Sequence, residues 1–577
     1  MLPTEPLPGP EQDRWFTEEV HRHERSVRSY LHHSFPAVRE VEDLVQESCL
    51  RVWRAKSARP IQSAKAFLAY MSPPPLIKRR RSHVLVLFAL LLGATTTFGA
   101  ERLLFLDPAT LQQAHGVTLG VNPVARSEPV IRIDRPWEGK MISFYTTVLE
   151  EDGRLRMWYI CRDADNSPNL AYAESRDGLR WEKPNLGLVD YRGSKDNNLV
   201  GVKSLDGAVF KDPQATAAER YGYLAHVANE GVFRFTSPDG FRWRRDTAAF
   251  LPFRADTQNV VVWDERSQRY AVYLRAWDVG KVWTDRLRKV VRLETADLAR
   301  PAGIKPSGRG SNPTNATDLP RIADEIPTVL AVDAQDPKGT DVYTISAQRY
   351  PLDPRWYVGF PSFFRRDKNI SDGRLEVQFI GGRDGVAWHR YDRVPFVPPG
   401  LDGSVDANMT FIGPGMVVRG DEVWLFGVGL RHRHGDTDAR RETADGTIFR
   451  HVIRVDGFVS LNFAATGGTC RVGPLAMKGT KLLLNLDTGA LGDLRVGLVE
   501  PDGKPIAGFG LDQCEPLQVN STHAIVTWKG KGHFRGGWPR GASRFFRHPG
   551  KGFQRLLQLA AVVNSRCSRF RNSRVWT

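Results

Sequence analysis

The sequence predicts a mainly β protein, with a five-bladed β-propeller and a small β-sandwich after a short α-helical fragment and a hydrophobic signal or anchor helix. Two observations support this fold class. Residues 101–450 show little helical periodicity. A turn motif, S-x-D-G-x-x-W, appears at 175–181 and 237–243, and a copy without the Ser follows at 382–388. Repeats of about 60 residues, each holding several strands, are typical of propeller blades.

The repeated motif has a structural explanation. Its Asp can accept backbone N–H bonds in a turn, its Gly can take positive φ, and its Trp can pack between sheets. We therefore expect it to shape blades rather than to catalyse. A second pattern, a charged turn followed by an aromatic strand, occurs five times and predicts five blades; its copies span 152–160, 219–227, 267–275, 341–350 and 421–429.

The two segments after residue 450 differ in composition. Alternating strands over 451–532 predict the sandwich, and residues 533–577 carry nine Arg, one Lys and no acid. One interpretation of that tail is a disordered basic arm that binds RNA or DNA; we favour a shifted reading frame that replaced the native final strand. The net charge of +16 is therefore local and does not indicate nucleic-acid binding. The five Cys lack metal-ligand spacing, so we expect neither a metal nor another cofactor.

Residues 71–100 read as a secretory signal. Four basic residues, Lys78 to Arg81, precede an uncharged run over 84–99 that is short for a membrane span. Small residues close the run, so we expect cleavage near Gly99 or Ala100 and an exported protein. The alternative is an inner-membrane anchor with the N-terminus in the cytoplasm. A signal that opens at Met71 also suggests two neighbouring genes read as one.

Residues 1–70 contain two predicted amphipathic helices, about 17–32 and 41–56. The string VEDLVQESCLRVWRAK at 41–56 resembles region 2 of extracytoplasmic-function sigma-70 factors. The resemblance implies that this helix contacts core RNA polymerase, through Asp43, Leu44, Gln46, Glu47 and Arg51. No later stretch reads as a helix-turn-helix, so DNA binding is not expected.

Residues 103–450 resemble the propellers of glycoside hydrolase families 32 and 43. The resemblance rests on LFLD at 104–107, on the aromatic and charged strands that follow, and on VFKDP at 209–213. It implies an oligo- or polysaccharide substrate and carboxylates around a central funnel. By this likeness Asp212 stabilises the transition state and Lys211 binds hydroxyls. The family 32 nucleophile motif is missing, and Glu138 is our substitute candidate.

Further pocket candidates are Asp256 for catalysis and Trp137, Asn259 and Glu325 for substrate binding. His432 and His434 could form a metal pair, but we favour a solvated loop. The leading functional prediction is an exported glycoside hydrolase. The alternatives are a non-catalytic glycan-binding propeller and a sigma-like initiation factor that acts through residues 1–70.

Overall fold

The computed structural model describes residues 102–577 except 204–205, 279–285, 305–318, 321–324, 437–442, 477–480, 491, 501, 531–553, 564–573 and 577. The chain divides into two units, Met1–Thr97 and Phe98–Thr577, and every described residue belongs to the second. The sigma-like segment and the signal-like run therefore lie outside the described residues. In the part that is described, every helix is too short or too polar to cross a bilayer.

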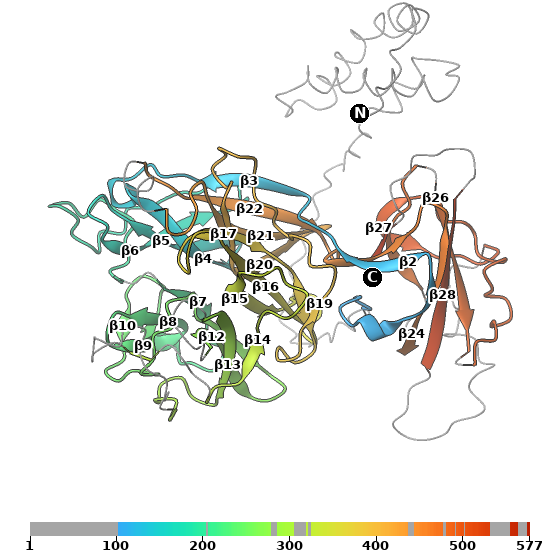
Figure 1. The fold of residues 1–577 in the computed structure, drawn as a ribbon, viewed down its shortest axis with the longest axis horizontal. Helices are drawn as coiled ribbons and strands as arrows, with labels where there is room; N and C mark the ends of the chain where they lie inside the picture. The colour runs from blue at the N-terminus through green and yellow to red at the C-terminus, as the bar shows by residue number, and fades with distance from the viewer. Residues whose placement is uncertain are drawn as a thin grey trace, which may run out of the picture. The chain divides into compact units, whose positions relative to one another are not determined.

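Five antiparallel blades form the larger part of this unit, each with its first strand innermost (Figure 1). Blade I contains β4 (Met141–Glu151), β5 (Arg154–Arg162) and β6 (Pro168–Ser175). Blade II contains β7 (Gly207–Lys211), β8 (Tyr221–Val227), β9 (Gly231–Ser237) and β10 (Arg244–Arg245). Blade III contains β11 (Val260–Asp264), β12 (Arg269–Trp277), β13 (Arg288–Thr295) and β14 (Thr328–Leu330).

Blade IV contains β15 (Thr340–Arg349), β16 (Tyr357–Arg366), β18 (Ile380–Gly382) and β19 (His389–Arg390). Blade V contains β20 (Met409–Arg419), β21 (Glu422–Leu430), β22 (Thr447–Arg454) and β3 (Arg126–Ile131). A further strand, β17 (Gly373–Val377), pairs with β16 and lies parallel to β20, so it joins the last two blades into one sheet. Short 3₁₀ helices fill loops: η3 (Pro108–Thr110), η4 (Pro136–Glu138) and η5 (Ala217–Glu219).

The ring is closed by β3, which precedes blade I in the chain but forms the outermost strand of blade V. Figure 1 shows β3 running beside β22. An outer strand tolerates Pro129, which has no N–H to donate. The pairing is reinforced by side chains, because Glu128 binds the buried guanidinium of Arg450. Closure thus ties residues more than 300 positions apart.

The repeated turn motifs are structural, as predicted. In the first copy, Asp177 Oδ1 accepts the backbone N–H groups of residues 179 and 180, and Gly178 has φ +72°. The same bonds recur around Asp239. Each glycine packs on the preceding blade: Gly178 on Trp424 of blade V and Gly240 on Trp158 of blade I. The motif therefore fixes both a turn and the seam between blades.

Blade III contains a divergent copy of the turn, which has the same hydrogen bonds but a different sequence. Asp297 N donates to Thr295 Oγ1, and Ala299 N donates to Asp297 Oδ1, as in the Ser-x-Asp turns. Thr replaces Ser and Leu replaces Gly, so the string TADL escapes the pattern. The turn therefore recurs between the second copy and the last one.

Two further antiparallel sheets share one apolar core, which is the arrangement of a β-sandwich. One sheet has the order β1-β24-β28-β26 and the other β2-β23-β29-β25-β27. Their bounds are β1 (Leu111–His115), β2 (Val117–Val121), β23 (Val459–Phe463), β24 (Gly468–Ala476), β25 (Leu483–Asp487), β26 (Gly492–Val499), β27 (Asn520–Ile525), β28 (Gln554–Val563) and β29 (Arg574–Trp576).

These sheets differ from the expected boundaries at both ends. Residues 111–121, which we assigned to the propeller, pair with β24 and β23 instead. The C-terminal tail, in which we expected no strand, supplies β28 between β24 and β26 (Figure 1). The apolar run LLQLAAVV accounts for that strand, and the basic composition around it concealed it.

Candidate functional site

A cluster of polar and aromatic side chains gathers at the N-terminal ends of the innermost strands. We call it the axis cluster; it comprises Phe144, Tyr145, Asp206, His226, Asp256, Arg275, Tyr343 and His434. Innermost strands of all five blades start around this point, so residues far apart in the sequence meet. A β-bulge between Ile142 and Thr146 of β4 turns the two aromatic residues of blade I toward the cluster.

Two carboxylates define the chemistry of the cluster. Asp206 directly precedes β7, and Asp256 lies four residues before β11. Their side chains are 19% and 26% exposed, so both are recessed but reachable. Burial raises the pKa of Asp206, His226 beside it (Nδ1 to Oδ2, 3.6 Å) opposes that rise, and the charge of Asp256 adds to it. The pKa of Asp206 is raised overall, which favours its protonated form.

Asp256 has the opposite environment because it forms an ion pair with Arg275. The side chain of Arg275 is 4% exposed, and its guanidinium lies 4.5 Å from the ring centre of Tyr343. Burial alone lowers the pKa of Arg275, but Asp256 and neighbouring tyrosines outweigh it and hold the pKa well above its usual range. A second guanidinium, that of Arg254, has its Nε 4.0 Å from Asp256 Oδ2. Two cations therefore favour the ionised form of this carboxyl.

An aromatic wall stands beside the carboxylates. Tyr343 Oη lies 3.0 Å from His434 Nε2, and His434 Nδ1 lies 2.6 Å from the carbonyl of Ser371. Because that carbonyl can only accept, Nδ1 carries the proton and Nε2 accepts from the tyrosine. Phe144, half-buried, has its ring centre 6.1 Å from that of His434. The wall offers an apolar face next to groups that can donate and accept protons.

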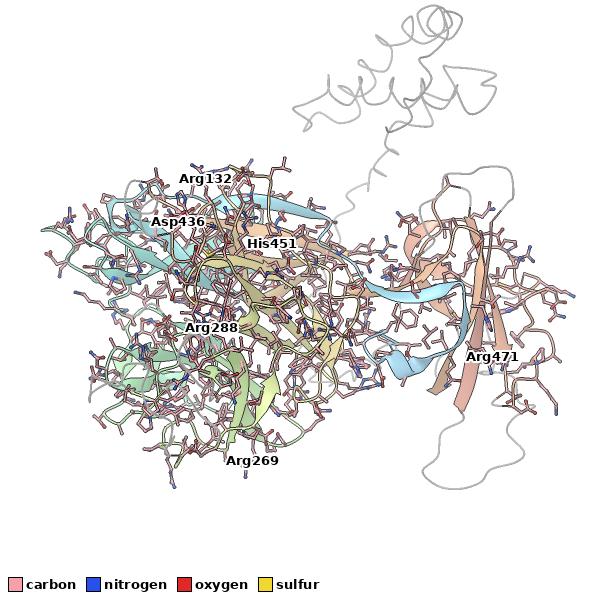
Figure 2. All side chains as sticks on the ribbon, in the orientation of Figure 1. Arg132, Arg269, Arg288, Asp436, His451 and Arg471 are labelled. Atoms are coloured by element: carbon pink, nitrogen blue, oxygen red, sulfur yellow. The ribbon has the colours of Figure 1, made fainter. Side chains whose placement is uncertain are left out.

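Behind this wall is a second ion cluster, which is largely buried. Asp341 Oδ2 accepts from Arg288 at 3.0 Å and from Arg366 at 2.8 Å, and the carboxylate is fully buried. Burial lowers the pKa of Arg288 despite that carboxylate. Figure 2 shows Arg288 in the middle of the propeller, whereas Arg269, at the other end of blade III, lies at its rim. This cluster fixes Tyr343, whose ring centre lies 5.2 Å from the Arg288 guanidinium.

The axis cluster can therefore perform acid–base chemistry. It pairs a carboxyl whose pKa is raised with a carboxylate stabilised by arginine, and pairs of this kind divide into a proton donor and a base or nucleophile. Metal chemistry has no matching ligand set in the described ranges, because no group of three His, Cys, Asp or Glu there could hold an ion.

The structure places the predicted residue Asp212 elsewhere. It follows the last residue of β7, six positions after Asp206, so the two lie about 20 Å apart along the strand. Its Oδ1 accepts from Tyr270 Oη at 2.7 Å, at the start of β12, whereas Asp256 binds Arg275 near the end of β12. Asp212 and Asp256 therefore lie at opposite ends of the blades.

Glu138 and Trp137 lie in η4, immediately before β4. The Glu138 carboxylate is fully buried, and Lys183 Nζ donates to both of its oxygens at 2.8 Å. Tyr159 Oη donates to it as well, at 2.6 Å. Trp137 Nε1 donates to Asn198 Oδ1 at 2.7 Å. These contacts tie the loop over blade I to its strands.

The other predicted residues are dispersed. Lys211, largely exposed, pairs with Glu151 at 2.8 Å, and Glu325 is exposed three residues before β14. Asn259 is fully buried next to β11. His434 is not on a solvated loop but in the aromatic wall, whereas His432 Nε2 lies 2.9 Å from Thr443 Oγ1. The residues proposed to contact RNA polymerase lie outside the described part of the chain.

Sequence reasoning missed Asp206, Arg275, Tyr343 and Tyr145. A local signal existed for Asp206 alone, because an Asp-Gly pair stands at the start of the strand GAVFK. The family-like VFKDP drew attention to the other end of that strand. The remaining residues sit inside aromatic strands, where only the fold distinguishes a residue that faces the axis from one that packs between blades.

Comparison with known proteins gives different matches for different parts of the chain. Residues 20–73 match the family model of Sigma-70 region 2, which confirms the sigma-like segment. The uncharacterized proteins MT1551 and Rv1502 of Mycobacterium tuberculosis are 30% identical to this chain over 142 and 144 residues. Each of these matches covers 22% of this chain, and the chain spans 45% of either relative.

Among solved structures, similarity extends to a thermostable family-43 glycoside hydrolase, with 13% identity, 58% of this chain, 92% of the other and a TM-score of 0.34. The Bombyx mori GH32 beta-fructofuranosidase shows 11% identity, 77% and 94% coverage and a TM-score of 0.34. An N-acetylgalactosamine deacetylase from F. plautii, in complex with blood group B trisaccharide, is 14% identical. The match covers 60% of this chain and 97% of the deacetylase, with a TM-score of 0.36. These proteins differ in activity, so function has to be argued from the site.

Proposed function

We propose that the propeller is a carbohydrate-active enzyme that hydrolyses glycosidic bonds at the axis cluster. The observation that carries the proposal is the pair of recessed carboxyls, Asp206 with a raised pKa and Asp256 ion-paired with Arg275. Glycoside hydrolysis requires two carboxyl groups in these unequal states. The aromatic wall of Phe144 and Tyr343 suits the apolar face of a sugar ring.

In this mechanism Asp206 donates its proton to the leaving glycosidic oxygen. Asp256 attacks the anomeric carbon or removes a proton from the attacking water, and the configuration of the released sugar distinguishes the two routes. Arg275 positions Asp256 and keeps it ionised while positive charge develops on the sugar. Neither route requires a metal or an organic cofactor.

The test is sugar release from plant and algal oligosaccharides by the full chain. Wild type should release reducing sugar, and Asp206→Ala and Asp256→Ala should each lose about 10²-fold or more of that activity. Asp212→Ala is the matched control, because its carboxyl lies at the far end of the blades and the variant should keep activity in the folded state. Saturable glycan binding without release would favour the non-catalytic alternative. Full activity in Asp206→Ala would contradict the proposal.

We also propose that the propeller is exported. The basic run before the uncharged segment at 84–99, and the small residues at its end, support cleavage near Gly99 or Ala100. Mass spectrometry of the mature N-terminus measures this directly. A chain that begins near Ala100 is the expected result. Recovery of peptides that span 67–75 from the exported fraction would contradict it.

For residues 20–73 we propose contact with core RNA polymerase, on the strength of the Sigma-70 region 2 match. The contact residues would be Asp43, Leu44, Gln46, Glu47 and Arg51. A pull-down with core polymerase tests this in the full chain, with Leu44→Asp as the variant that should lose binding. Equal capture of wild type and variant would exclude this helix as the contact.

A further inference from the structure

Beneath the axis cluster the propeller contains a polar interior. Among the described residues, the buried aliphatic hydroxyl and amide side-chain atoms without a protein hydrogen-bond partner all belong to Gln258, Asn259, Ser346 and Gln348. The first three are at most 1% exposed. Buried groups of this kind normally have a partner, either protein or ordered water. Their concentration in one place calls for a common explanation.

Two of these four residues, Gln258 and Gln348, bond across the interior of the ring. Gln258 Nε2 donates to the carbonyl of Ile412 at 3.5 Å, which links the entrance of blade III to blade V. Blades III and V are not neighbours in the ring, so this bond spans the axis. Gln348 of blade IV accepts from the N–H of Gly415 in blade V at 3.1 Å. The same short list of residues therefore connects three blades at their innermost strands.

One strand carries a continuous polar row along the axis. On β15, Thr344, Ser346 and Gln348 alternate with Ile345 and Ala347, which pack in the apolar core between blades III and IV. Side chains two apart share a face, so the three polar residues line the opposite side over about 13 Å. A bulge between Val342 and Thr344 sets this register.

The row reaches the axis cluster at one end and a partly exposed residue, Gln348, at the other. Thr344 Oγ1 lies 2.6 Å from Thr257 Oγ1, and Thr257 is adjacent to Asp256. At the end of the row away from Asp256, Gln348 is partly exposed, whereas Thr344 and Ser346 are buried. The polar side chains thus run from the partly exposed Gln348 toward Asp256.

We propose that this row holds a file of internal water that connects the opposite face of the propeller with Asp256. Water suits the row because each unpartnered group is a neutral donor or acceptor, and an internal water needs two to four such partners. The water would satisfy Gln258, Asn259 and Ser346. Occupancy by water does not depend on the proposed hydrolysis.

The supply role does rest on the proposed function. In hydrolysis the water oxygen forms the bond to the anomeric carbon, its proton passes to a carboxylate, and the bond to the leaving sugar breaks with a proton from Asp206. While the leaving sugar still blocks the outer opening of the site, water that moves along the row of Thr344, Ser346 and Gln348 can arrive beside Asp256. The route would then favour hydrolysis over transfer to another hydroxyl.

The experiment counts long-lived internal waters in the full chain by oxygen-17 magnetic relaxation dispersion. Ser346→Ala and Gln258→Met remove polar atoms with little change of shape, and each should lose dispersion amplitude relative to wild type. Ser362→Ala is the control, because that buried hydroxyl donates to the Thr410 carbonyl off the path and should leave the amplitude unchanged. Asn259 is left intact because its φ of +44° suits Asn.

Equal amplitudes in all four proteins, or a crystal structure with a metal cation in place of water, would overturn the proposal. Activity provides a second readout: with methanol as competing acceptor, Ser346→Ala should shift product from hydrolysis to transfer by several-fold. If water is lost but this ratio stays unchanged, the supply role is wrong. If wild type releases no sugar at all, the proposed function is wrong, but the relaxation-dispersion amplitudes still test whether the row holds internal water.

Discussion

Substitution of the two catalytic candidates by Asn should change stability in opposite directions. The folded state raises the pKa of Asp206 above its unfolded value near 3.9, so ionisation at pH 7 works against folding. Each unit of that rise costs about 1.4 kcal/mol. Asp206→Asn removes this cost and should therefore stabilise the protein at pH 7.

Asp256→Asn should instead destabilise the protein, because it leaves Arg275 buried without its carboxylate. Breaking a buried pair costs about 3–5 kcal/mol, and the partial exposure of Asp256 places the expected loss near the lower end. Urea unfolding at pH 7, followed by Trp fluorescence, measures both variants. The gain from Asp206→Asn should shrink as the pH falls through the raised folded-state pKa of the carboxyl, and it should vanish only below about 3.9, where the wild-type carboxyl is protonated in both states.

If both substitutions destabilise to a similar extent, the unequal environments of the two carboxyls are wrong, and with them the division into acid and base. If Asp206→Asn stabilises and abolishes sugar release, the carboxyl is kept at a cost to folding for the sake of activity. Active sites commonly show this trade-off.

Three further predictions concern the scaffold. Burial lowers the pKa of His451 to about 3, so the folded state favours the neutral imidazole. The free energy of unfolding should therefore fall by up to about 1.4 kcal/mol for each pH unit below about 6.5, where the unfolded state binds the extra proton. His451→Asn should flatten that slope, as measured by urea unfolding at a series of pH values. Lys183→Met should cost about 3–5 kcal/mol by leaving the Glu138 carboxylate buried without its cation, measured by urea unfolding. Gly413→Ala should lower the thermal midpoint, because its Cβ would lie 1.8 Å from the Thr146 carbonyl between blades V and I; an unchanged midpoint would contradict this packing.

Blades were predictable because their determinants are local. Asp177 and Gly178 make a turn through bonds within four residues, so the letters S-x-D-G carry the information. The divergent copy at Thr295 shows the limit, since the hydrogen bonds persist where the letters change. The closing strand β3 and the early strands at 111–121 were not predictable, because their partners lie hundreds of residues away.

The candidate site was less accessible to sequence reasoning for a related reason. Asp206, Asp256 and Tyr343 come from three blades, and only Asp206 had a local signal, the Asp-Gly pair at the start of β7. A carboxyl becomes chemically unusual here only through what surrounds it, since burial and the charge of Asp256 act on Asp206 while Arg275 acts on Asp256. Asp212 illustrates the converse, because its motif matched but its strand carries it to the far end of the blade, beside Tyr270. In a propeller the decisive property of a residue is which end of an innermost strand it occupies, and strand ends are the least certain feature of any reading from sequence.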